Sequence, residues 1–408
     1  MTPVRTRPIY MDHNATTPVH PEVVEAMLPY FSREFGNPSS TTHVYGRRAA
    51  EAVNEAREAI ARLLGASSPD EVVFTAGATE SDNLAIRGGA RRLASRGDHI
   101  VTCAIEHEAV LETCASLREE GFETTVVPVE ANGCVDPGRI RSAMTQRTIL
   151  VSIMMANNEI GTVQPLAEIG AICHARGVVF HSDAVQAFGR IPVAVADLGV
   201  DLLSVTAHKM YGPKGIGALY IRRGVDVAPL SHGGGQERNL RSGTLNVPGI
   251  VGFGKAAEIA ARDMEVESSR QRRLRERLWR EIQRRVEGVS VNGSLERRLP
   301  NNLSVAFEGV ESEAVLTAMR NVAALSAGSA CASQDGKGSY VIRALGEPRS
   351  AEKRARSSIR FGLGRSNNDA DVDHVVEGLA SVVARLRSMA PPAVPVGRGV
   401  AEGEHTTS

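Results

Sequence analysis

The residues with the clearest chemical potential in this chain surround Lys209, in the stretch Thr-Ala-His-Lys-Met-Tyr-Gly-Pro-Lys-Gly over 206–215. The apolar run 200–205 before it is typical of a buried strand, so Lys209 lies just past a strand end, where α/β proteins form ligand crevices. Only five of the 47 basic residues are lysines. A lysine amine can form a Schiff base, which arginine cannot. A solvated loop lysine is the alternative, and Lys214 in its Gly-Pro-Lys-Gly turn is the rival amine.

A lysine that forms a Schiff base suggests pyridoxal phosphate, and this cofactor needs further groups. Asp183 ends the apolar run 178–183, and a carboxylate there could keep the pyridine nitrogen protonated. Capping of the next helix is the alternative role for Asp183. The Gly-Ala-Thr stretch 77–79 begins a predicted helix after the run 71–74, and the free N–H groups of such a helix start suit a phosphate.

Polar residues follow the other predicted strands as well. His107 comes after the strand 99–103 and could stack on the cofactor ring, although a lone histidine is often structural. Asn158 follows the strand 149–154, Gln186 follows Asp183 by three residues, and both could hydrogen-bond the phenolic oxygen of the ring. Thr206 and His208 flank the lysine and could donate to the phosphate. The agreement of these placements favours a cofactor site at one edge of a sheet.

The positioning elements follow from an alternation of strands and helices. Predicted strands are 71–74, 99–103, 124–129, 149–154, 178–181 and 202–205, and predicted helices are 21–35, 43–64, 77–95, 109–120, 166–175 and 248–287. This alternation predicts an α/β fold with a mostly parallel sheet in a large domain, residues 17–262. Short elements from 292 onward predict a smaller α+β domain, formed by 1–16 and 263–390. The tail 391–408 is rich in Pro, Gly and polar residues and is expected to be disordered.

Composition excludes several classes of function. The 47 basic and 47 acidic residues balance, which counts against direct nucleic-acid binding through bulk charge. No apolar run has membrane-spanning length, and no signal peptide is recognisable. Five cysteines without a Cys-x-x-Cys pair make a disulfide framework or a structural zinc site unexpected. We therefore expect a cytoplasmic protein in a reducing compartment, with no metal site of its own.

Several motifs in this order resemble the group I (NifS/IscS-like) cysteine desulfurases, which are pyridoxal-phosphate enzymes of the class V aminotransferase type. The motifs are Ala-Thr-Thr-Pro at 15–18, Phe-Gly-Asn-Pro-Ser at 35–39, Thr-Ala-Gly-Ala-Thr-Glu-Ser-Asp-Asn at 75–83, Ala-Asn-Asn-Glu-Ile-Gly at 156–161, His-Ser-Asp-Ala-Val-Gln at 181–186, His-Lys-Met-Tyr-Gly-Pro-Lys-Gly at 208–215 and Arg-Ser-Gly-Thr at 241–244. The resemblance implies a fold-type-I transferase and a homodimer. It also implies conversion of L-cysteine to L-alanine, with a persulfide left on the enzyme.

The resemblance also implies a role for each site residue. Lys209 carries the cofactor and Asp183 partners its pyridine nitrogen, while His107 stacks on the ring and moves protons. The ring oxygen is held by Asn158 and Gln186. The phosphate is held by Ala78, Thr79, Thr206 and His208, with Thr244 reaching in from the other subunit.

Two further residues act on the substrate in this resemblance. Cys331 lies in a Gly-Ser-Ala run that matches the family's persulfide loop, and this run has nothing to pack, so we expect it to be exposed and mobile. Arg360 resembles the arginine that grips the substrate carboxylate, and its planar fork suits that task. Asn157 is expected to assist Arg360.

Other activities stay open at this point. A selenocysteine lyase or an aminotransferase of the same fold is the enzymatic alternative, although an aminotransferase needs no thiol such as Cys331. A non-catalytic scaffold for sulfur transfer is the other alternative, and intact Lys209, Asp183 and Cys331 argue against it. The expected partner is a sulfur-acceptor protein, with iron–sulfur cluster assembly leading and tRNA or DNA thiolation also open. Cys331 could then contact a cluster on that partner.

Overall fold

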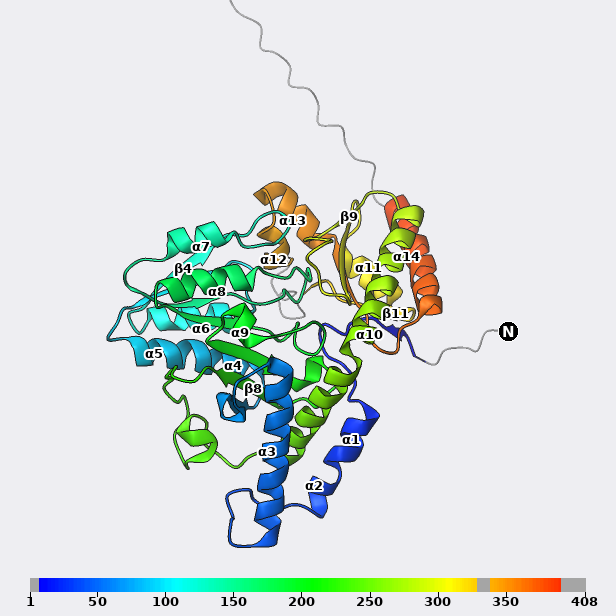
Figure 1. The fold of residues 1–408 in the computed structure, drawn as a ribbon. Coiled ribbons are helices and arrows are strands. Elements are labelled where there is room, and N and C mark those ends of the chain that lie inside the picture. Colours follow the sequence, from blue (N-terminus) through cyan, green and yellow to red (C-terminus); the bar gives the residue numbers. More distant parts are fainter. Residues whose placement is uncertain (1–6, 329–337, 390–408) are drawn as a thin grey trace, which may run out of the picture.

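The computed structural model describes residues 7–328 and 338–389, and its largest element is a seven-stranded sheet (Figure 1). The strand order is β2-β8-β7-β6-β5-β3-β4. The strands are β2 (Val72–Thr75), β3 (His99–Cys103), β4 (Glu123–Val127), β5 (Thr148–Ser152), β6 (Val179–Asp183), β7 (Leu202–Thr206) and β8 (Gly217–Ile221). All neighbours pair in parallel except β8, which is antiparallel to β2 and β7. The expectation of a mostly parallel sheet is confirmed.

Helices cover both faces of this sheet. They are α3 (Val44–Leu64), α4 (Ala78–Asn83), α5 (Gly89–Leu93), α6 (Glu108–Arg118), α7 (Pro137–Ala143), α8 (Leu166–Ala175), α9 (Val195–Leu198) and the long α10 (Val247–Arg285). Successive strand residues point to opposite faces, so Ile100 and Val101 of β3 join different apolar cores. One core lies under α4, α5 and α6 and the other under α3, α8 and α10. The near-continuous apolar character of the strands is thus the result of burial on both faces.

Two predicted helices differ from the structure. The prediction of one helix over 21–35 is wrong, because Pro29 begins a new helix after Leu28, giving α1 (Pro21–Met27) and α2 (Pro29–Ser32). The stretch 77–95 is helical, but a π-helical segment over 84–88 separates α4 from α5. By contrast, α3 ends at Gly65 as expected, since Gly65 takes a left-handed conformation with φ of 64°.

A second, smaller sheet lies beside the large one. Its order is β12 (Ser358–Gly362), β10 (Asn302–Phe307) and β9 (Val289–Val291), all antiparallel. It packs with α11 (Ser312–Met319), α14 (Asp369–Met389) and the C-terminal part of α10. α13 (Pro348–Arg356) contacts β10, while α12 (Tyr340–Arg343) joins an apolar core of the large sheet. Ile9 and Met11 join its core, and β1 (Ile9–Tyr10) pairs with β11 (Ala323–Ala324).

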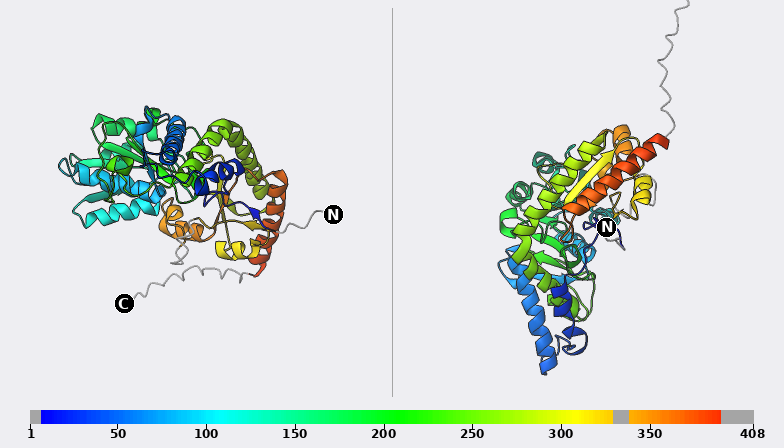
Figure 2. Two further views of the ribbon diagram at one scale, coloured as in Figure 1. Left: turned by 90° about the horizontal axis from the view of Figure 1, so that it is seen from below. Right: turned by 90° about the vertical axis from the view of Figure 1, so that its right-hand side faces the viewer.

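The long helix α10 connects these two regions. Its first half packs on α1 and α3 and its second half on α14 (Figure 2). The division into domains of 17–262 and of 1–16 with 263–390 stays a prediction. Cys331 and the tail 391–408 lie outside the described residues. Across the part of the chain that is described, no helix is both long and apolar enough to cross a membrane.

Candidate active site

A cavity of about 980 Å³ opens where the carboxyl ends of the parallel strands face the small sheet. Such strand ends are the usual ligand position in open α/β sheets. The structure brings most of the predicted site residues to the wall of this cavity: Ala78, Thr79, His107, Asn158, Asp183, Gln186, Thr206, His208, Lys209 and Arg360. The cavity is therefore the candidate active site.

Lys209 lies directly after β7, in a short 3₁₀ turn over Ala207–Lys209. Its ammonium nitrogen, Nζ, donates hydrogen bonds to the carbonyl oxygens of Asn14 at 2.7 Å and Ala15 at 2.6 Å. Burial lowers the pKa of Lys209 to about 7, and the charge of Arg360 adds to this effect. A substantial fraction of the amine is therefore neutral, and thus nucleophilic, near neutral pH. Lys214 also lines the cavity, but its side chain is exposed.

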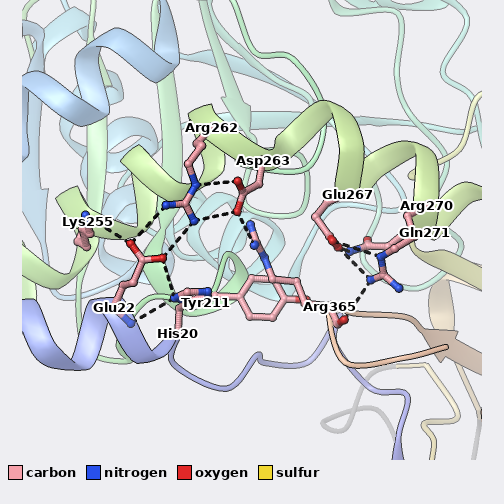
Figure 3. A network of polar contacts seen from close by, with 10 residues as sticks. All are labelled: His20, Glu22, Tyr211, Lys255, Arg262, Asp263, Glu267, Arg270, Gln271 and Arg365. Carbon is pink, nitrogen blue, oxygen red and sulfur yellow. Dashed lines mark hydrogen bonds and ion pairs between the residues drawn. The ribbon is translucent and has the colours of Figure 1, made fainter.

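The turn that carries Lys209 is held by contacts from distant segments. Tyr211 has a φ of 67°, a left-handed conformation that is unfavourable without support. Its hydroxyl accepts a hydrogen bond from the backbone N–H of Arg365 at 2.7 Å, and Arg365 pairs with Asp263 of α10 at 2.7 Å. Figure 3 shows this network along α10. Arg190 also donates to the carbonyl oxygen of Lys209 at 2.8 Å, so the turn is fixed from two sides.

Three carboxyl groups lie buried below the cavity, on Asp82, Glu106 and Asp183. Burial raises the pKa of Asp183, while the electrostatic effect of His107, a hydrogen bond from the Val185 N–H at 2.8 Å and the charge of Lys209 oppose the shift. Burial also raises the pKa of Asp82 well above its usual value, and the charge of Asp183 adds to the shift. The pKa of Glu106 rises to about 8. Of the three carboxyl groups, Asp183 is the one for which the charge of Lys209 opposes the effect of burial on the pKa.

Asp82 and Glu106 were not predicted as part of the site, although both lie inside or beside motifs. Glu106 precedes His107, and its Oε1 accepts hydrogen bonds from the Cys103 thiol at 2.9 Å and the Met154 N–H at 2.8 Å. His107 caps α6 through its Nδ1, which accepts from the Ala109 N–H at 3.1 Å. Nε2 of His107 is therefore the ring nitrogen left to exchange a proton in the cavity.

Asn158 and Gln186 both line the cavity, but their side-chain amides differ in hydrogen bonding. Oδ1 of Asn158 is buried and has no hydrogen-bond partner among the described residues, so it is free to accept from a ligand. The Gln186 amide instead pairs with Asn14, in both directions, at 2.9 Å. Asn14 is a site residue that the sequence interpretation missed.

The structure does not bring Asn157 to the cavity. Its side chain is fully buried, donating to the Ile105 carbonyl at 2.8 Å and accepting from the N–H groups of Glu159 and Ile160. These contacts give Asn157 a structural role in shaping the turn that carries Asn158, and its expected help to Arg360 stays a prediction.

Where the cavity meets the start of α4, it is lined by small and hydroxyl-bearing residues. A Cβ added at Gly77 would meet no heavy atom within 4 Å, so the start of α4 borders open space. Burial, followed by the charge of Lys209, lowers the pKa of His208 to about 4, and its ring contacts Thr16 at 3.2 Å. The hydroxyl of Thr206 donates to the Ile216 carbonyl at 3.1 Å. Thr244 is exposed and does not line this cavity.

Arg360 lies on β12 and is only 3 % exposed. Its guanidinium donates to the Asn158 carbonyl at 2.9 Å and pairs with Asp12 at 2.8 Å. The Nε–H is buried and has no partner among the described residues. A buried cation with an unused N–H in the cavity is suited to a carboxylate. The ion pair between Asp12 and Arg360 was not predicted from the sequence.

The four described cysteines are all buried, and the pKa of each thiol is raised chiefly by that burial. For Cys114 and Cys173 the pKa rises to about 12. Because the thiolate is the nucleophile, none of these four groups is suited to attack a substrate.

The residues around the cavity fit pyridoxal phosphate. Asp183 would offer the pyridine nitrogen a carboxyl partner, Asn158 has a free acceptor on the cavity wall, and the start of α4 beside the open space at Gly77 would offer N–H and hydroxyl donors to a phosphate. A lysine amine with a lowered pKa completes the set. The fold and the cavity thus define the class of fold-type-I pyridoxal-phosphate enzymes.

Comparison with known protein families supports the same class of enzyme. The model of the aminotransferase class-V family matches residues 9–375, so the chain belongs to this family of pyridoxal-phosphate-dependent enzymes. The chain is 54% identical over 395 residues to the cysteine desulfurase IscS of Anaeromyxobacter sp. strain Fw109-5, with 96% of each chain covered.

Solved structures show the same similarity. A NifS-like protein matches with a TM-score of 0.85 and 37% identity, covering 93% of this chain and 100% of the other. A structure of SspA in complex with cysteine matches with a TM-score of 0.77 and 39% identity, covering 87% of this chain and 98% of that chain.

Proposed function

We propose that this enzyme is a cysteine desulfurase, which converts L-cysteine to L-alanine and collects the sulfur as a persulfide on Cys331. The observation that carries the proposal is the presence of a lysine amine and a buried, partly unsatisfied arginine in one cavity, which suits an amino-acid substrate. The names of the relatives and the solved SspA complex with cysteine support cysteine as that amino acid.

The cofactor, when bound, supplies an electron sink for negative charge at the substrate α-carbon. Lys209 would hold the cofactor, and burial lowers the pKa of its free amine to about 7, which favours the nucleophilic neutral form. Asp183 keeps the pyridine nitrogen protonated. Arg360 binds the substrate carboxylate through its free N–H groups, with Asp12 holding the guanidinium in place.

The remaining wall residues orient the cofactor in this proposal. Asn158 and Gln186 hold the ring oxygen, and His107 stacks on the ring and moves protons through Nε2. The phosphate is held by Ala78, Thr79, Thr206 and His208, with Thr244 contributed by a second subunit. The exposed position of Thr244, outside this cavity, is compatible with a contact made in a partner copy.

Cys331 acts as the thiolate that takes the sulfur atom from the substrate. The main support for Cys331 is that the described thiols are unsuited to this reaction. They are buried and their pKa values are raised: Cys103, Cys114, Cys134 and Cys173. A persulfide on Cys331 can then be passed to a second protein.

A homodimer and an acceptor protein are the proposed partners. Leu28, Phe31 and Phe35 are each more than half exposed, and the Phe35 ring stacks on exposed Tyr45 with centroids 5.5 Å apart. Such a group of exposed apolar side chains is typical of an interaction surface, and we assign it to a second copy of the chain. We propose that the protein works in the cytoplasm and delivers sulfur chiefly to a scaffold for iron–sulfur cluster assembly.

The test is a product assay on the cofactor-loaded enzyme. With L-cysteine and a thiol reductant, alanine and sulfide should form in equal amounts, and Lys209→Ala should abolish both. Alanine formation from selenocysteine but not from cysteine would favour a selenocysteine lyase. Amino-group transfer from cysteine to a 2-oxo acid, without sulfide, would favour an aminotransferase and contradict the proposal.

A further inference from the structure

Arg190, in the loop after β6, is a buried cation that forms no ion pair with any carboxylate of the described residues. The residue is only 8% exposed, and its Nη2 donates hydrogen bonds to the carbonyl oxygens of His13 at 2.7 Å and Lys209 at 2.8 Å. Its Nη1 is buried and has no hydrogen-bond partner in the described part of the chain. Because an unpaired charge is costly to bury, we expect this arginine to have a use beyond packing.

The two carbonyl groups that Arg190 contacts belong to the segments that enclose the amine of Lys209. Nζ of Lys209 donates to the carbonyl oxygens of Asn14 and Ala15, and His13 directly precedes these two residues. The guanidinium therefore contacts both the segment that holds the amine and the main chain that carries it. A substitution of Arg190 changes the position of the amine as well as its electrostatic surroundings.

Charged and titratable groups from several elements face the Lys209 amine. They are Asp12 of the N-terminal segment, Asp183 at the end of β6, Arg190 of the loop that follows, Arg360 of β12 and, in the same turn as the lysine, His208. Burial has the largest effect on the Lys209 pKa and lowers it, the two arginines lower it further, and the two aspartates raise it. Arg360 is assigned to the substrate carboxylate in the proposed function. Of the two arginines, Arg190 is thus the one without an assigned role.

We propose that Arg190 is a positioning residue for Lys209, which joins the lysine turn to the N-terminal segment and places an uncompensated positive charge near the amine. The inference rests on the proposed role of Lys209 as the residue that holds the cofactor. A positive charge at this place disfavours a second positive charge on the lysine nitrogen, so the neutral, nucleophilic form is favoured. The hydrogen bond to the Lys209 carbonyl keeps the guanidinium in a fixed position relative to the lysine.

Substitutions of Arg190 can separate its charge from its hydrogen bonds. Arg190→Gln removes the charge and keeps N–H donors, whereas Arg190→Lys keeps the charge and loses the planar fork. Arg298→Gln is the matched control, since Arg298 is 5% exposed and does not line the cavity. The measurement is a pH titration of the visible absorbance of each cofactor-loaded enzyme, which changes when the nitrogen that links Lys209 to the cofactor binds a proton. Borohydride reduction and peptide mapping identify the residue that carries the cofactor.

We expect the pH midpoint of the absorbance change to follow the charge of residue 190. In Arg190→Gln the midpoint should rise by about one pH unit, because removing a nearby positive charge favours the protonated nitrogen. Arg190→Lys and Arg298→Gln should keep the midpoint of the wild type. A loss of packing alone would not explain this pattern, because both variants of Arg190 lose the contacts of the fork. If Arg190→Gln does not fold, Arg190→Met removes the same charge and keeps a long side chain.

Either of two results would overturn the inference. An unchanged midpoint in Arg190→Gln would show that the charge of Arg190 does not act on the lysine nitrogen. A shift of equal size in Arg190→Lys or in Arg298→Gln would show that the effect arises from a general loosening of the fold. Failure of the proposed role of Lys209 is distinguishable, because borohydride would then fix the cofactor of the wild type on another residue. Failure of the proposed desulfurase activity is also distinguishable, since the titration is carried out without cysteine.

Discussion

The two sides of the active site differ in how they are built. The floor, formed by Asp183, Lys209 and Glu106, comes from the carboxyl ends of β6, β7 and β3, which are parallel strands of one sheet. The opposite wall, formed by Arg360 and Tyr340, comes from the small sheet and from a helix distant in sequence. The floor thus gathers buried acids and the reactive amine, while the wall presents a cation. Substitutions in the floor should change chemistry, and substitutions in the wall should change substrate binding.

Lys209 lies at the junction of these two regions. Its amine is held by carbonyl oxygens of Asn14 and Ala15, in the N-terminal segment that also provides Asp12 to Arg360. Its lowered pKa arises from burial in the floor and from the charges of Arg360 and Arg190. The pKa of the Lys209 amine therefore depends on groups from both sides of the site, and removing this amine should reduce turnover more than the other substitutions.

Lys209→Ala should abolish the cofactor attachment that borohydride makes permanent, because the amine that holds the cofactor is gone. Turnover of cysteine should fall below detection. The measurement is the cofactor retained on the denatured protein after reduction, followed by mass spectrometry of the labelled peptide. Lys214→Ala is the matched control, since Lys214 lines the same cavity but is exposed. Label lost in the control and kept in Lys209→Ala would show that the wrong lysine was chosen.

Asp183→Asn should keep the cofactor but slow turnover by about two to three orders of magnitude, since a neutral amide does not hold the pyridine nitrogen protonated. The measurement is kcat for alanine formation, alongside cofactor content. Asp82→Asn is the matched control in the same cluster, because an amide resembles the neutral acid that burial favours there. A larger loss of kcat in Asp82→Asn than in Asp183→Asn would indicate that Asp82, and not Asp183, partners the pyridine nitrogen.

Arg360→Lys should raise KM for cysteine about ten- to a hundredfold, because lysine keeps the charge but cannot reproduce the planar set of N–H groups. The visible spectrum of the resting enzyme should be unchanged, since Arg360 does not bind the cofactor in this account. An unchanged KM would remove Arg360 from the substrate site. A changed resting spectrum with a normal KM would indicate that Arg360 acts on the cofactor and not on the substrate.

The smallest effect concerns stability of the cofactor-free protein. Because the pKa of Lys209 is lowered to about 7, the unfolded chain binds more protons than the folded chain between that value and the ordinary lysine pKa. The contribution of Lys209 to the free energy of unfolding should therefore rise with pH across that window and be flat below it. Urea unfolding of the wild type and Lys209→Met at several pH values measures the difference. A difference that does not change with pH would contradict the lowered pKa.

Lys209 and Asp183 of the floor could be proposed from the sequence because each lies at the end of its own strand, whereas Glu106 was missed. A strand end is a local pattern, and parallel strands bring such ends together. Asn14 and Asp12 could not be found in this way, since their contacts join segments that are distant along the chain. The sequence also could not separate Asn157 from Asn158, of which Asn158 lines the cavity while the Asn157 amide donates to the buried Ile105 carbonyl.

The fold shows the same limit. The alternating pattern predicted the large sheet, but the break between α1 and α2 at Pro29 and the pairing of β8 between β2 and β7 were not foreseen. A proline at a helix start and a proline inside a helix look alike in one sequence, and strand order depends on long-range packing.

The central claim is that sulfur from cysteine is collected on Cys331, and the most direct test is to locate that sulfur. The cofactor-loaded enzyme is treated with L-cysteine without reductant, and its peptides are mapped by mass spectrometry. We expect one added sulfur atom on the peptide containing Cys331, and none in Cys331→Ser, which should keep its cofactor but fail to form alanine. Sulfur found instead on Cys103, Cys114, Cys134 or Cys173, with Cys331→Ser still active, would contradict it.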